Sequence, residues 1–154
     1  IDSKKRVKRT LAYHGLASAS GLILGILLQL LLDFSITNVL LYYVSIILIA
    51  NCFLAIVEFL IETFGDIGKF IALIILVLQL AAAGGTFPIE TVTKGFRWLH
   101  PLLPMTYTID LLRESLVTIE SKLLTHNFII VFIIFIVFFG INIAHDIIRQ
   151  KKNE

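Results

Sequence analysis

Three carboxylates lie four residues apart near the end of a long apolar run, at Glu58, Glu62 and Asp66. Residues four apart share one helix face, so the acids would form one line if the helix continues through Asp66. A carboxylate at mid-bilayer costs on the order of 2.5–3.5 kcal/mol by insertion scales, so such residues usually serve a function. That function would be a proton or substrate relay entered from the cytoplasm. The alternative, which we favour because Glu58 lies late in its run, is an acidic rim that pairs with Lys69 or a neighbouring helix.

Uncharged polar side chains also interrupt the apolar runs, one amide in each. These residues are Gln29, Asn51, Gln79 and Asn142. We expect them to form interhelical hydrogen bonds of roughly 0.6 kcal/mol each. Gln79 joins Glu58 and Glu62 as a candidate intramembrane polar site.

No pattern in the sequence indicates catalysis, a cofactor or a metal. The chain lacks a glycine-rich phosphate loop ending in Lys-Ser or Lys-Thr, an HExxH motif and a G-x-S-x-G motif. Its four histidines fall near the ends of apolar runs on both sides of the membrane, which does not predict a metal site. Cys52 is the only cysteine, so no internal disulfide forms. We expect a protein that is not an enzyme.

The elements that must position these residues are membrane-spanning helices. Hydrophobic residues make up 58% of the 154 residues and charged residues 16%, against about 45–50% and about 25% in soluble domains. The mean hydropathy is +0.94. Runs that can cross the bilayer fall at about 11–32, 36–61, 67–83 and 128–144. The sequence therefore predicts an all-α, polytopic membrane helix bundle with about four spans, embedded in lipid and not bound to nucleic acid.

Basic residues predict the orientation of this bundle. Nine of the 13 lysines and arginines precede the first span, follow the fourth or begin the third. The other four are Lys94, Arg97, Arg113 and Lys122. Because basic residues favour the cytoplasm, we expect both ends of the chain on the cytoplasmic side of the cell membrane.

The first span carries small residues at intervals of four, at Ala17, Gly21 and Gly25. Such a ridge lets another helix approach closely. We expect it to pack against a helix of the same chain, and the alternative is a homodimer interface.

A break follows the third span at Gly84, Gly85, Thr86, Phe87 and Pro88. Glycine releases helical dihedrals and proline cannot continue the helix, so we expect a re-entrant turn. After Pro104 the apolar residues recur every three or four positions, which predicts an amphipathic helix along the outer membrane surface. The whole segment of about 84–127 is then extracytoplasmic.

Residues 78–89 (LQLAAAGGTFPI) and 99–107 (LHPLLPMTY) resemble the C-terminal membrane domain of the YhgE/Pip (phage infection protein) family. That family is related to type 2 permeases of ABC exporters and includes EsaA, the accessory factor of Gram-positive type VII secretion. Some members are phage receptors. The resemblance implies that residues 1–154 are the C-terminal transmembrane domain of a longer protein with a large extracytoplasmic domain.

Two functions follow from the resemblance. The first is a scaffold of a type VII (ESX/Ess-like) system that contacts other secretion-system membrane subunits. The second is an ABC type 2 permease subunit that works with a separate ATPase, since the chain has no energy-coupling motif of its own.

Overall fold

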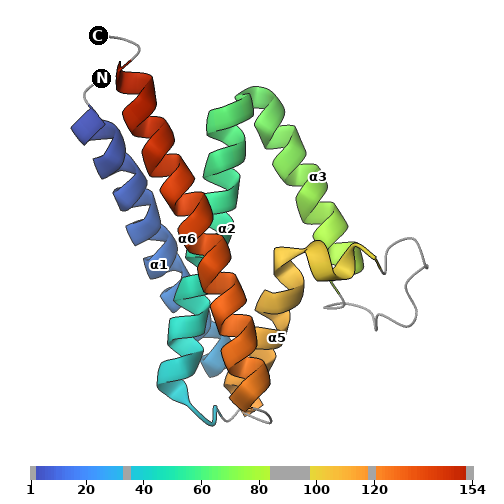
Figure 1. Cartoon of the computed structure of the whole chain (residues 1–154). Helices are drawn as coiled ribbons and strands as arrows, with labels where there is room; N and C mark the ends of the chain where they lie inside the picture. The colour runs from blue at the N-terminus through green and yellow to red at the C-terminus, as the bar shows by residue number, and fades with distance from the viewer. Residues whose placement is uncertain (1–2, 33–35, 84–97, 118–120, 152–154) are drawn as a thin grey trace.

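The computed structural model describes residues 3–32, 36–83, 98–117 and 121–151, and in these ranges it contains helices and no strand. The helices are α1 (Ser3–Leu32), α2 (Val39–Phe64), α3 (Asp66–Ala82), the short 3₁₀ helix η2 (His100–Leu102), α5 (Pro104–Val117) and α6 (Ser121–Lys151). The prediction of an all-α membrane helix bundle is confirmed (Figure 1).

Three of the helices are long and apolar enough to cross a membrane, within Lys5–Leu32, Val39–Phe64 and Ser121–Ile148. The third predicted span, 67–83, is the helix α3, which has 17 residues and is not among these three. At 1.5 Å per residue it is about 25 Å long, shorter than the hydrocarbon core of about 30 Å. The exact limits of the four spans therefore stay a prediction.

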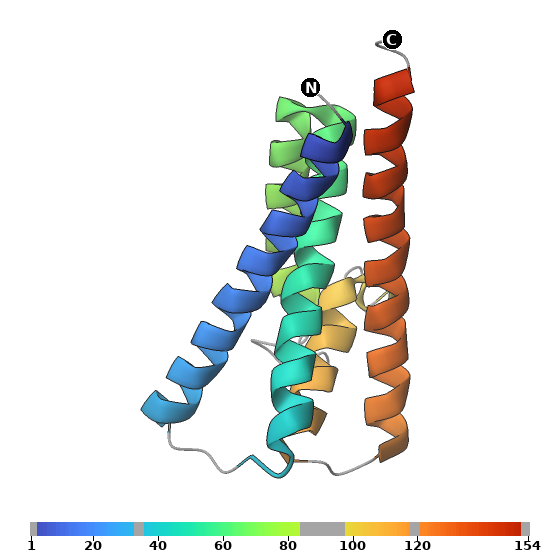
Figure 2. The same cartoon turned by 90° about the vertical axis from the view of Figure 1, so that its left-hand side faces the viewer.

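Helix α1 runs in one direction along the bundle, and α2 and α6 both run in the opposite direction (Figures 1 and 2). The start of α1 and the end of α6 lie at one end of the bundle, which we call the terminal end. The opposite end, called the turn end, holds residues 36–38 between α1 and α2. Helix α2 is central because it contacts α1, α3, α5 and α6.

Glycine makes the sharp turn from α2 into α3 feasible. Gly65 ends α2 with φ +62° and ψ −130°, a conformation that favours glycine. One turn later, a Cβ on Gly68 would overlap the backbone carbonyl of Leu60. The two helices approach this closely because position 68 has no side chain.

Helices α3 and α5 follow one another beside α2 and together run from the terminal end to the turn end (Figure 1). The His100 ring connects them, since its Nδ1–H donates to the Ala82 carbonyl at the end of α3 (2.9 Å). At the turn end the backbone N–H of Thr37 donates to Leu116 O of α5 (3.2 Å). The chain thus passes from one end of the bundle to the other in two pieces, α3 and α5.

Helix α5 packs along α2 and α6 and does not lie across the ends of the bundle. Its buried side includes Leu111, Thr106 and Glu114, at 0%, 6% and 8% exposure. The apolar positions Met105 and Ile109 are only partly buried. Polar residues of α5 such as Thr106 and Glu114 therefore face the bundle, and the part of 84–127 formed by α5 runs beside the central helix.

The interior of the molecule holds polar as well as apolar side chains, and its outside is largely apolar. Asp146, Ser45 and Ser115 are at most 1% exposed, while Leu31 and Leu40 are 77% and 76% exposed. Lipid favours leucine on the outside and acids on the inside. Apolar side chains have no free-energy cost in contact with lipid, whereas polar side chains need hydrogen-bond partners from the protein. The chain is a multi-pass membrane protein.

Candidate functional site

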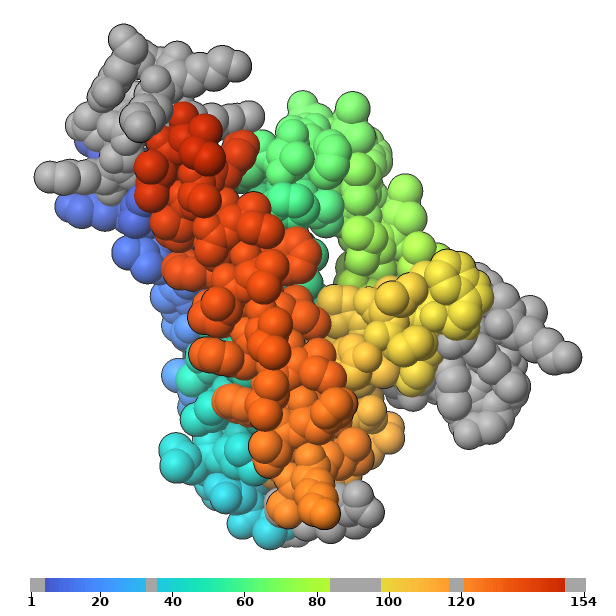
Figure 3. Space-filling model, viewed as in Figure 1, coloured from blue at the N-terminus to red at the C-terminus, as the bar shows by residue number. Residues whose placement is uncertain are grey.

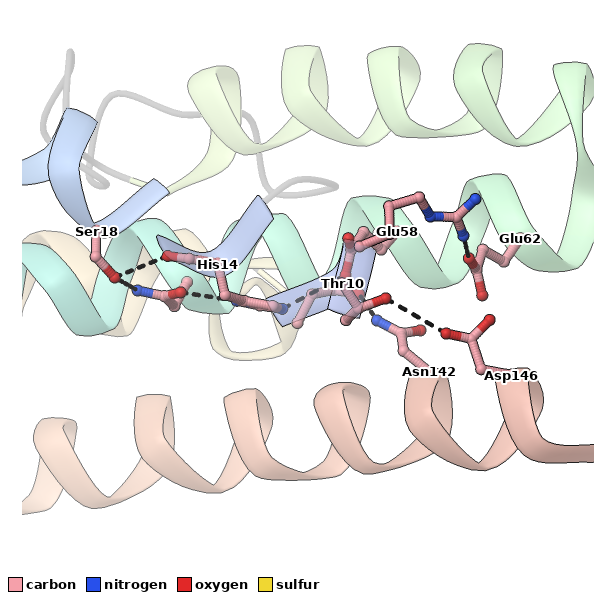
Figure 4. A network of polar contacts seen from close by, with 10 residues as sticks. Thr10, His14, Ser18, Glu58, Glu62, Asn142 and Asp146 are labelled. Carbon is pink, nitrogen blue, oxygen red and sulfur yellow. Dashed lines mark hydrogen bonds and ion pairs between the residues drawn. The ribbon is translucent and has the colours of Figure 1, made fainter. Parts of the chain in front are cut away.

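A cluster of polar side chains lies between α1, α2 and α6, toward the terminal end of the bundle (Figure 4). We call it the polar cluster. Its members are Arg9, Thr10, His14 and Ser18 of α1, Asn51, Glu58 and Glu62 of α2, and Asn142, His145 and Asp146 of α6. On α1, Thr10, His14 and Ser18 lie four residues apart, on α2 the spacings are seven and four, and on α6 Asn142 lies three and four residues before the other two members, so each helix presents one polar stripe to the interior.

Asn51 is the most connected member. Its side-chain NH₂ donates to Ser18 Oγ and to the Ile47 carbonyl, both at 2.8 Å. Its Oδ1 lies 2.7 Å from His14 Nδ1. Ser18 in turn donates to the His14 carbonyl at 2.8 Å. One amide therefore joins α1 to α2 in the middle of two apolar helices.

The other nitrogen of the His14 ring faces a carboxylate. His14 Nε2 lies 3.4 Å from Glu58 Oε2, and both side chains are nearly buried, at 9% and 13% exposure. Phe139 and Phe135 of α6 hold the ring edge-on, with centroids 4.9 and 5.7 Å away. The ring is thus confined among α1, α2 and α6.

The remaining contacts lie closer to the terminal end. Arg9 Nη2 donates to Glu62 Oε1 at 2.8 Å, and the second oxygen of Glu62 lies 3.5 Å from His145 Nδ1. Thr10 Oγ1 donates to Asp146 Oδ2 at 3.4 Å. These contacts connect α1 and α2 to α6 at the level of the last turns of α2.

A fourth contact, from Asn142 Nδ2 to the Ala55 carbonyl (2.9 Å), lies deeper between α6 and α2. The predicted role of amides as interhelical links is confirmed for Asn51 and Asn142. It is also confirmed for Gln29, whose Oε1 accepts from Tyr43 Oη at 2.7 Å.

The three acids would form one line only if α2 continued through Asp66, and it does not. Glu58 and Glu62 share the inner face of α2, but the helix ends at Phe64 and Asp66 begins α3. Asp66 instead pairs with Lys69 at 2.7 Å on the exposed surface. The hydrogen bond and the charge of Lys69 lower the pKa of Asp66. Lys69 therefore pairs with only one of the three acids within the described residues.

Gln79 lies apart from the two acids with which the sequence grouped it. It is 3% exposed and lies near the end of α3, the opposite end of that helix from the turn after α2. Its Oε1 has no hydrogen-bond partner among the described residues.

The ridge of small residues on α1 faces α2. A Cβ on Gly21 would lie 3.2 Å from Ile46 Cγ2, and one on Gly25 would lie 2.8 Å from Ile46 Cδ1. Ala17 is half-buried in the same row.

The predicted re-entrant break at residues 84–88 lies outside the described residues.

Among the members of the cluster from α1 and α6, sequence reasoning identified only Asn142 as an interhelical contact and placed none of them in a polar site with Glu58 and Glu62. Their signal was the helical spacing of Thr10, His14 and Ser18, and of Asn142, His145 and Asp146, within otherwise apolar runs. Two such stripes indicate helices that face a third polar stripe.

In the part of the chain that the structure describes, no group of three His, Cys, Asp or Glu residues is placed to hold a metal ion.

Comparison with known proteins agrees with this architecture. The family model of the EsaA helical domain matches residues 2–143. The chain is also 52% identical over 69 residues to the uncharacterized protein YhgE of Bacillus subtilis (strain 168). That match covers 45% of this chain and 9% of YhgE, so the chain spans only a small part of its relative. No solved structure matches. With a family match over nearly its whole length and a polar-cored membrane bundle, the chain belongs to the EsaA helical domain family.

Proposed function

We propose that this domain is a membrane-embedded accessory scaffold of a Gram-positive type VII (ESX/Ess-like) protein secretion system. The match to the EsaA helical domain over residues 2–143 carries the proposal. In this role the domain anchors a large extracytoplasmic domain and contacts other membrane subunits of the secretion system. It performs no chemistry of its own.

The pairing inside the polar cluster supports an anchoring role. Asn51, Asn142 and Thr10 each make a contact that joins two different helices. Such contacts fix the helices relative to one another at a modest energetic gain. A fixed bundle transmits the position of an external domain to the cytoplasmic side.

Outward-facing apolar side chains supply contact surfaces for neighbouring subunits or lipid. Phe70 of α3 and Leu31 of α1 are 69% and 77% exposed. Helix α3 packs mainly on α2 and to a smaller extent on α5, and its outer side is open in Figure 3. The small residues Gly21 and Gly25 already contact α2, so subunits would dock elsewhere.

The second candidate is a permease subunit of an ABC exporter that works with a separate ATPase. The observation that favours it is the crossing divided between α3 and α5, which His100 connects. A divided crossing provides backbone that can rearrange around a path. This candidate requires a bound exporter ATPase.

Site-specific photocrosslinking of the full-length protein in native membranes distinguishes these functions. A photoreactive residue replaces Phe70 on α3, and the matched control replaces Leu31 on α1. Capture of type VII membrane subunits or the secretion ATPase from position 70 would support the scaffold. Capture of an exporter ATPase would support the permease, and normal secretion after deletion of the full-length protein would contradict the scaffold.

A further inference from the structure

The hydrogen bonds around Asn51 fix the direction of its amide. The Ile47 carbonyl only accepts hydrogen bonds, and Ser18 uses its hydroxyl proton on the His14 carbonyl. Both therefore need a donor from Asn51, which is its NH₂ group. Reversing the amide would place its oxygen against two acceptors, so Oδ1 must face His14.

This direction fixes one proton of the His14 ring. Oδ1 of Asn51 only accepts, so His14 Nδ1, 2.7 Å away, must carry a hydrogen and donate it. In a neutral imidazole with a hydrogen on Nδ1, Nε2 presents a lone pair. That lone pair faces Glu58 Oε2 at 3.4 Å. Neither atom has a hydrogen-bond partner in the described structure.

Two acceptors that face one another in a buried site need a proton between them. We propose that His14 and Glu58 form an intramembrane proton-binding site, which holds one proton between Nε2 and Oε2. The proton comes from water at the terminal end and adds to the lone pair of either atom. The product is a carboxylic acid donating to the imidazole or an imidazolium paired with the carboxylate, and no other bond changes.

The charges around the pair favour uptake of this proton. From α2 the pair faces Glu62, from α6 Asp146 and from α1 Arg9. Of the three carboxylates Glu58, Glu62 and Asp146, Glu62 pairs with the Arg9 guanidinium, and buried negative charge without a partner is costly. His145 of α6 also lies in the cluster, with Nδ1 3.5 Å from Glu62 Oε2.

Arg9 and Glu62 connect the buried pair to the terminal end. The Arg9 side chain is 48% exposed and Glu62 18% exposed, so the cluster becomes progressively more accessible toward that end. One oxygen of Glu62 and Nδ1 of His145 lack hydrogen-bond partners in the described structure. Both are placed to receive a proton before Glu58, which lies one turn along the same face of α2.

Proton binding at this site would control the contact between α1 and α2. With the proton, His14 and Glu58 attract one another across the two helices. After its loss, a lone pair and a carboxylate repel one another at 3.4 Å. This inference does not depend on the scaffold role, because it concerns only the contacts within the bundle.

The test is a pH titration of the full-length protein in lipid nanodiscs. Histidine ¹⁵N resonances report the protons on Nδ1 and Nε2, and the infrared carboxyl band reports protonated Glu58. The variants are Glu58→Gln and, as the matched control, Asp66→Asn, an exposed acid that pairs with Lys69. We expect one titration step for the pair, lost in Glu58→Gln and retained in Asp66→Asn. In Glu58→Gln the carboxylate is absent, so no proton is shared between Nε2 of His14 and an oxygen of residue 58.

Any of three results would overturn the inference. One is a His14 titration that is the same in the wild type and in Glu58→Gln. A second result needs no variant. It is a wild-type spectrum in which the His14 ring lacks a hydrogen on Nδ1, or in which Nε2 keeps an unshared lone pair at every pH. A spectral change that follows sodium at fixed pH and ionic strength would also overturn it, since the ligand would then be a metal cation.

Discussion

At the scale of single residues, the side chain with most influence is Asn51 and not an acid. It satisfies Ser18, Ile47 and His14 at once, and it determines which nitrogen of His14 carries a hydrogen. Glu58 and Glu62 were visible in the sequence because acids in an apolar run are rare. Their partners were not, because a histidine or threonine near the end of a span has many ordinary roles.

Replacement of Asn51 by alanine tests this interpretation. Asn51→Ala removes three hydrogen bonds, so we expect the free energy of unfolding to fall by about 2 kcal/mol, at roughly 0.6 kcal/mol for each bond in a membrane. Asn142→Ala is the matched control, because it removes one bond, to the Ala55 carbonyl. Its expected loss is about 0.6 kcal/mol. Unfolding in mixed micelles measures both, and equal losses would contradict the central role of Asn51.

At the scale of elements, close contacts at glycine determine how α2 meets its neighbours. The sequence showed the small residues of α1, and their spacing predicted one close-packing face. It did not reveal the importance of Gly68, since a glycine in a polar connection usually marks only a turn. The contact of Gly68 with the Leu60 carbonyl depends on the angle between α2 and α3, which is a tertiary property.

A methyl group at position 68 should separate α2 from α3. Gly68→Ala places Cβ against the Leu60 carbonyl, which cannot move without distorting α2. We expect a loss of about 3 kcal/mol in the free energy of unfolding, at the upper end of ordinary overpacking. Gly140→Ala is the control, because nothing lies within 4 Å of its added Cβ. A thermal unfolding series compares them, and similar midpoints would argue against the tight turn.

A larger side chain on the ridge should separate α1 from α2. Gly21→Leu meets Ile46 and Ala50, and we expect it to destabilise the bundle by about 1–3 kcal/mol. Gly15→Leu is the control, because a Cβ at this position has open space around it. It should lower the free energy of unfolding much less. If the ridge instead mediates a dimer, Gly21→Leu would change the mass of the detergent-solubilised protein and leave its unfolding unchanged. Light scattering and denaturant titration together separate these cases.

At the scale of the whole molecule, the fold places polar side chains inside and apolar ones toward lipid. Helices α3 and α5 together run from the terminal end to the turn end, and α6 runs back to the terminal end. That arrangement returns the end of α6 to the level of the start of α1. It agrees with the distribution of basic residues, from which we predict a cytoplasmic terminal end.

Cysteine labelling in whole cells tests this orientation. Cys52 is buried, so a Cys52→Ala background removes the native thiol. Lys5→Cys at the terminal end should resist a membrane-impermeant maleimide until the cells are opened. Thr37→Cys, exposed at the turn end, should react at once. Labelling of both positions from the same side would exclude the predicted topology.

The sequence by itself determined the class of the molecule and most of its helices, because burial in lipid imposes long apolar runs. It also identified Glu58 and Glu62, since charge in such a run is conspicuous. Only the tertiary structure placed His14, Asn51 and Asp146 beside them, and separated Asp66 and Gln79 from them. The reason is physical: spacing along one helix fixes which residues share a face. The face of another helix that they meet depends on how the helices pack.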